Sequence, residues 1–124
     1  MNFWRIVFAV AALFNFVVGG AILLQPEAIA TLPFTGTAAE SLLVQTAGWL
    51  IFVFGVGYAM VAASPMRYRG IAVLGVIGKA AVPFFAYRFF AAGQIPFENF
   101  ALSLVDAVFV VLFAWFLFSA RNDK

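Results

Sequence analysis

Cysteine and histidine are both absent from the 124-residue sequence, and charged residues make up only 10% of it. The chain therefore cannot form a disulfide, and it lacks the side chains that hold most protein zinc and haem groups. Nucleophilic catalysis by a serine–histidine or cysteine–histidine pair is excluded for the same reason. We expect no metal, no other cofactor and no catalytic residue of these classes.

Hydrophobic residues are too frequent for a water-soluble domain. They account for 66% of the chain, whereas soluble domains have about 45 to 50% apolar and about 25% charged residues. The net charge of +2 comes from scattered residues, and no basic run alternates with polar residues as in a nucleic-acid-binding protein. The composition predicts an integral membrane protein surrounded by lipid, and we expect no nucleic-acid partner.

Long apolar runs take the place of the missing charge. Four of them approach the ~20 residues that a helix needs to cross ~30 Å of hydrocarbon, and they span residues 3–24, 42–63, 70–91 and 97–119. The sequence therefore predicts an all-α fold, a four-helix transmembrane bundle in which residues 1–124 form a single integral membrane domain. The first run exceeds the ~7 to 15 residues of a signal-peptide core, so we expect an uncleaved helix there.

The connections between these runs predict the topology. Connections 64–69 and 92–96 are short, which favours antiparallel neighbours in an up-and-down arrangement. Basic residues gather on the side that the termini share with connection 64–69, and the opposite loops have none, so the positive-inside rule predicts two cytoplasmic termini. In the outer connection, 25–41, Pro26 suits the start of a short interfacial helix that Pro33 would end. The basic residues in question are Arg5, Arg67, Arg69, Arg121 and Lys124.

Small residues recur on one face of three of the predicted spans. In lipid, small side chains let helix backbones approach closely, since no hydrophobic effect drives the helices together. Each of these faces also carries a polar residue, and we therefore expect the polar groups to point together into the bundle. The three faces comprise Ala12, Asn15 and Gly19; Ser41, Gln45, Gly48, Gly55 and Ala62; and Ala72, Gly75, Lys79 and Ala86.

Three polar residues, Asn15, Lys79 and Asp106, lie ~12 to 18 Å from the outer ends of their predicted helices, given a rise of 1.5 Å per residue. A single Lys or Asp at a helix centre costs about 2.5 to 3.5 kcal/mol in lipid, so neither is expected to stand unpaired. Cβ directions aim Arg88 at Asp106 at least as well as Lys79, and we expect Asp106 to accept hydrogen bonds from Arg88, Lys79 or both. The predicted ligand-binding site or buried polar cluster comprises Asn15, Gln45, Tyr58, Lys79, Tyr87, Arg88 and Asp106.

Four stretches carry most of these features in order, namely "LFNFVVGGAILLQPE", "VQTAGWLIFVFGVGYAMVAASP", "RGIAVLGVIGKAAVP" and "LVDAVFVVLFAWFL". Together they resemble a family of small four-helix bacterial membrane proteins and, more loosely, the DoxX-like group. The resemblance covers nearly the whole chain, but "VDAVFV" around Asp106 departs from the group's pattern. It implies a multi-pass protein of the bacterial inner membrane, in a group where some members are accessory subunits of membrane redox enzymes.

Three functions fit these observations. The first is a non-catalytic accessory or assembly protein, with a membrane-protein partner or a second copy, whose buried polar cluster is structural. The alternative is a binder or carrier of a lipophilic small molecule, such as a quinone, lipid or sterol-like compound, in an outward-opening pocket walled by aromatic residues. A membrane isomerase that uses Asp106 as a proton shuttle ranks last. The aromatic residues expected in the pocket wall are Phe52, Tyr58, Phe84, Phe85 and Tyr87.

Overall fold

The computed structural model describes residues 2–24 and 38–122, and the regular structure in this part of the chain is entirely helical. Its four helices are α1 (Asn2–Leu24), α3 (Ala38–Ala63), α4 (Arg69–Ala91) and α5 (Phe97–Asn122). Each contains a segment long and apolar enough to cross a membrane. The four predicted spans are thus confirmed as helices. Residues 38–41, expected in the outer connection, already belong to α3, and the expected interfacial helix lies outside the described residues.

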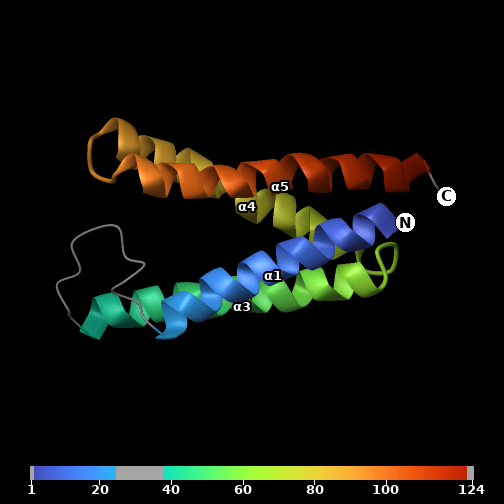
Figure 1. The fold of residues 1–124 in the computed structure, drawn as a ribbon, viewed down its shortest axis with the longest axis horizontal. Helices are drawn as coiled ribbons and strands as arrows, with labels where there is room; N and C mark the ends of the chain where they lie inside the picture. Colours follow the sequence, from blue (N-terminus) through green and yellow to red (C-terminus); the bar gives the residue numbers. More distant parts are fainter. Residues whose placement is uncertain (1, 25–37, 123–124) are drawn as a thin grey trace.

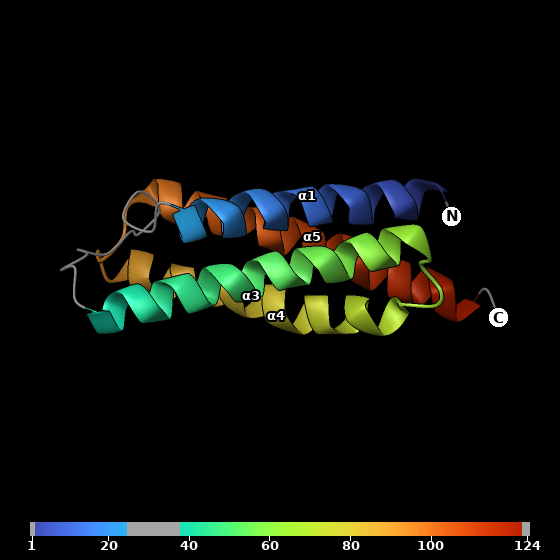
Figure 2. The same ribbon diagram turned by 90° about the horizontal axis from the view of Figure 1, so that it is seen from below.

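The helices form two pairs that run along the long axis of the molecule (Figures 1 and 2). Most contacts lie within the pairs α1–α3 and α4–α5, and few connect one pair to the other. Figure 1 shows the pairs as two layers that lie close together at the end where α1 begins and α5 finishes, and further apart toward the α4–α5 connection. This difference determines which half of the bundle is packed and which half is hollow.

Glycine residues allow the close packing of α1 on α3. A Cβ atom on Gly19 would lie 2.7 Å from the Gly48 carbonyl oxygen and 2.7 Å from the Phe52 amide nitrogen, so the two backbones are in direct contact. One on Gly55 would lie 2.8 Å from the Phe16 ring of α1. Such close approach strengthens the van der Waals packing on which helix association in lipid depends. The small-residue faces predicted for the first two spans therefore meet each other.

Aromatic side chains fill the bundle at the end where α1 begins. Phe8, Phe113 and Phe116 are fully buried, and the rings of Phe8 and Phe113 stack with their centroids 4.5 Å apart. Closer to the end, Trp4 of α1 meets Trp115 of α5 edge to face, with centroids 5.2 Å apart. Such ring pairs contribute about 0.5 to 1.5 kcal/mol beyond the area they bury. This aromatic core holds α1 and α5 together and closes one end of the bundle.

The outward faces of the helices are apolar. Large hydrophobic side chains are exposed on every described helix, among them Ile6, Leu43, Ile77 and Val111. Water-soluble monomers rarely expose contiguous apolar surface on this scale. The surface therefore suits a hydrocarbon environment, as the length and hydropathy of the helices also indicate.

Candidate functional site

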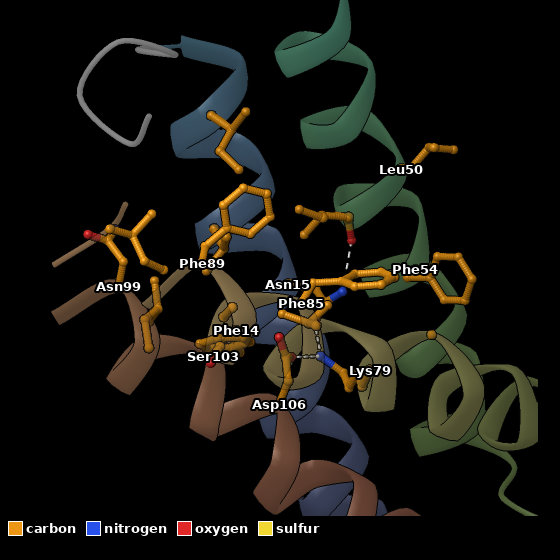
Figure 3. A pocket seen from close by; sticks show the side chains of 18 of the residues that line it. Phe14, Asn15, Leu50, Phe54, Lys79, Phe85, Phe89, Asn99, Ser103 and Asp106 are labelled. Carbon is orange, nitrogen blue, oxygen red and sulfur yellow. Dashed lines mark hydrogen bonds and ion pairs between the residues drawn. The ribbon is translucent and has the colours of Figure 1, made fainter. Parts of the chain in front are cut away.

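A cavity of about 580 Å³ lies between the two helix pairs, in the half of the bundle toward the α4–α5 connection (Figure 3). Its outer part is lined by Ile22, Phe89 and Ile95, and its deep part by Tyr58 and Asp106. Small-molecule sites typically measure about 300 to 1,000 Å³. The cavity is therefore large enough for a drug-sized or lipid-like molecule.

The walls of the cavity are formed mostly by hydrophobic side chains. Leu50 and Phe54 of α3 line the cavity together with Phe85 and Phe89 of α4, and all four side chains are exposed. Parts of the cavity wall are therefore accessible from outside the bundle.

A chain of three hydrogen bonds at the deep end of the cavity links all four described helices (Figure 3). Lys79 Nζ on α4 donates to Asp106 Oδ1 on α5 at 2.6 Å and to Asn15 Oδ1 on α1 at 3.0 Å. Asn15 Nδ2 in turn donates to the Ile51 carbonyl oxygen on α3 at 3.0 Å. Lys79 and Asn15 are buried, and Asp106 is partly exposed. The three polar residues predicted to lie deepest thus form one cluster.

Three aromatic rings surround the ammonium group of Lys79. Its Nζ atom lies 5.3 Å from the ring centroid of Phe14, 5.4 Å from that of Tyr58 and 5.2 Å from that of Phe109. Ring faces attract cations, by about 2 kcal/mol where both are shielded from water. Asp106 and the rings together stabilise the buried positive charge.

Tyr58 contributes its ring to the cluster while its hydroxyl group points toward α4. The side chain is almost completely buried. A Cβ atom on Gly75 of α4 would lie 2.9 Å from the Tyr58 hydroxyl oxygen and 2.9 Å from the Phe113 ring. The small residue at position 75 thus leaves room for both rings, and Tyr58, which lines the cavity, packs edge to face on Phe113 of the aromatic core.

The structure does not bring Gln45, Tyr87 and Arg88 to the cluster. Gln45 is exposed and donates to Ser41 on its own helix at 3.2 Å. The exposed ring of Tyr87 packs on Phe100, with centroids 6.0 Å apart. Arg88 is exposed on the last turn of α4. At 3.6 residues per turn, nine residues separate Arg88 from Lys79 by roughly 180°, so the two side chains leave opposite faces of the helix.

Of the aromatic residues expected in the pocket wall, Tyr58 and Phe85 line the cavity. Phe52 packs instead on Phe16 and Trp49, and Phe84 is exposed.

Sequence reasoning missed several residues of the cavity and of the surroundings of Lys79. Phe14 and Phe109 flank the ammonium group of Lys79, and the buried Ser103 lines the cavity and donates to the Phe100 carbonyl oxygen. Asn99, Ser103 and Asp106 are spaced four and three residues apart, which places them on one face of α5. That spacing is visible in the sequence and could have identified Ser103.

Comparisons with protein-family models, curated proteins and solved structures found no match for the chain. The resemblance to the DoxX-like group therefore stays a prediction. Among residues 2–24 and 38–122, no group of three or more histidine, cysteine, aspartate or glutamate side chains is placed to hold a metal ion. The chemistry of the site has to be inferred from its cavity and its polar cluster.

Proposed function

We propose that this protein binds or carries an amphiphilic small molecule, a quinone, lipid or sterol-like compound, within the membrane. The observation that carries the proposal is the cavity of about 580 Å³ that has hydrophobic walls and a polar cluster at its deep end. Such a site matches a molecule with an apolar body and one polar head. The exposed wall residues of α3 and α4 provide a route of entry from lipid.

The proposal includes an orientation in the membrane. The four helices cross the bacterial inner membrane in an antiparallel, up-and-down order with both termini in the cytoplasm. Two observations support this. Arg5, Arg67 and Arg69 belong to the same end of the bundle, and the first turn of α1 and the last turns of α5 lie together at that end in Figure 1. In this orientation the cavity occupies the outer half of the membrane.

A second candidate function, a non-catalytic accessory or assembly protein, is supported by the hydrogen-bonded chain itself. Asn15 and Lys79 connect the two helix pairs, so the cluster has a structural role whether or not a ligand binds. Buried polar groups can fix helix register in this way. The two functions differ in whether the cavity is occupied in the native membrane.

Co-purification distinguishes these functions. The protein is extracted in mild detergent, and lipophilic molecules bound to it are identified by mass spectrometry in wild type, Ala86→Phe and Ala80→Phe. Ala86 lines the cavity, whereas Ala80 on the same helix is exposed and does not line it. We expect one lipophile to accompany wild type and Ala80→Phe and to be lost from Ala86→Phe, because the new ring fills the cavity.

Thermal unfolding of the three proteins provides the control, since Ala86→Phe should keep the wild-type unfolding temperature. Wild type without an enriched lipophile would support the accessory function instead. Equal retention of the lipophile by Ala86→Phe would show that it binds elsewhere. Val18→Phe, which fills the cavity from α1, repeats the test on another helix.

A further inference from the structure

We infer that the cavity selects amphiphiles whose head group is uncharged and donates a hydrogen bond, that is, a hydroxyl group. This inference rests on the proposed function and specifies its ligand class. It follows from the charge of the deep end of the cavity and from the kind of hydrogen-bonding atom that remains there. The contacts of Lys79, Asp106 and Ser103 determine this charge and the hydrogen-bonding atoms that remain.

The deep end carries no net charge. Lys79 and Asp106 are the two charged residues among the described residues that line the cavity, and they form a salt bridge at 2.6 Å. An anionic head group would have to lie beside the Asp106 carboxylate, and a cationic one beside the Lys79 ammonium group. In a water-excluded site, either arrangement leaves a charge without a partner. A neutral head group avoids this cost.

The ammonium group of Lys79 is already enclosed. It donates to Asp106 and Asn15, and the rings of Phe14, Tyr58 and Phe109 lie within 5.4 Å of its Nζ atom. Little of the Lys79 ammonium group therefore remains available to donate a hydrogen bond to a ligand. The Asp106 side chain is the more exposed of the pair, 15% against 8% for Lys79.

Two acceptor oxygens at the deep end receive no hydrogen bond from the described residues. A carboxylate has two acceptor oxygens, and Asp106 uses Oδ1 for Lys79, which leaves Oδ2 for a molecule in the cavity. The Ser103 hydroxyl group donates its proton to the Phe100 carbonyl oxygen, so its oxygen can only accept from a ligand. A head group that donates a hydrogen bond fits these two oxygens, and an ether or ester oxygen does not.

Four probes with the same straight hydrocarbon chain test the inference, namely hexadecanol, hexadecyl methyl ether, hexadecanoic acid and hexadecylamine. Their binding to the purified protein in detergent is measured by native mass spectrometry at neutral pH. We expect hexadecanol to bind wild type about tenfold to hundredfold more tightly than the other three, the range that a hydrogen bond to a charged acceptor provides. Ala86→Phe should bind all four poorly.

Charge-changing variants should reverse the selectivity. Asp106→Asn leaves the Lys79 charge uncompensated, so hexadecanoic acid should become the preferred probe. Lys79→Met leaves the Asp106 charge, and hexadecylamine should then bind best. Because both variants disturb a buried pair, Ser103→Ala serves as the milder variant: it removes one acceptor whose only described bond stays within α5, and it should weaken hexadecanol binding severalfold without affecting the ether.

The outcomes separate this inference from the function on which it rests. If wild type binds the acid, the amine or the ether as tightly as hexadecanol, the inference is wrong, although the protein still binds amphiphiles. If Ser103→Ala weakens the alcohol and the ether equally, the requirement for a donor is wrong. If wild type binds no probe and carries no native lipophile, the proposed function itself fails.

Discussion

Lys79 is the residue that most requires stabilising contacts, because its charged side chain is buried halfway along a hydrophobic helix. One carboxylate, one amide oxygen and three ring faces stabilise its ammonium group. Asp106 depends on the same bond, since Lys79 is the cation with which it pairs. Each partner therefore offsets the desolvation of the other, and removal of one is expected to be worse than removal of both.

Replacement of Lys79 by Met, or of Asp106 by Leu, should lower the free energy of unfolding by about 3 to 5 kcal/mol, because each leaves an uncompensated buried charge. The double variant should recover most of this loss. Unfolding in detergent with increasing denaturant, followed by circular dichroism, measures the three values. Arg88→Met is the matched control on the exposed face of α4 and should change stability little. A double variant as unstable as either single one would mean that the pair is not energetically coupled.

At the residue scale, the sequence predicts how deep the polar residues lie in the bundle, but it predicts less completely which way their side chains point. Asn15, Lys79 and Asp106 were predicted to lie deep in the bundle, and they meet there. Depth and Cβ tilt alone make Arg88 a partner for Asp106 as suitable as Lys79. The rotation of about 100° per residue, which places Arg88 on the far face of α4, decides the matter. The positions of Phe14 and Phe109 around Lys79 depend on helix packing and could not be derived from spacing on one helix.

At the scale of helices, the strength of packing follows the distribution of small residues. Gly19 lets α1 touch the backbone of α3 at Gly48. The hydrophobic runs predicted all four helix positions, and the start of α5 at Phe97 agrees with the predicted span. The start of α3 at Ala38 differs from the predicted residue 42. Hydropathy locates the apolar part of a helix, whereas a helix continues into polar sequence wherever its backbone hydrogen bonds are satisfied.

Gly19→Ala should lower the free energy of unfolding by about 1 to 3 kcal/mol, the usual cost of overpacking. The added methyl group would lie 2.7 Å from backbone atoms of Gly48 and Phe52, and backbone in a helix cannot move aside as a side chain can. The neighbouring Gly20 provides the control, because a Cβ atom there would meet nothing within 4 Å. Gly20→Ala should be neutral or slightly stabilising, since alanine favours the helix. Equal effects at the two positions would contradict a direct backbone contact.

Over the whole molecule, the two halves of the bundle have different roles. Stacked and edge-to-face rings such as Phe8 and Phe113 pack one half tightly, while the two helix pairs separate around the cavity in the other half. The sequence suggested an aromatic-walled pocket as one alternative, but of the five expected wall residues only Tyr58 and Phe85 line the cavity. A cavity depends on the angle between helix pairs, and that angle arises from contacts between residues far apart in the chain.

The absence of cysteine from the chain makes the proposed orientation directly testable, because any introduced thiol is unique. Ser64 follows α3, and the exposed Gln94 follows α4, so they lie in connections at opposite ends of α4. In intact bacterial cells, a membrane-impermeant maleimide should label Gln94→Cys, and Ser64→Cys should react only after the cells are permeabilised. Both substitutions are small and preserve Arg67 and Arg69, on which the positive-inside argument depends. Labelling of Ser64→Cys but not Gln94→Cys in intact cells would show that the orientation is the reverse of the proposed one. The cavity would then lie in the inner half of the membrane.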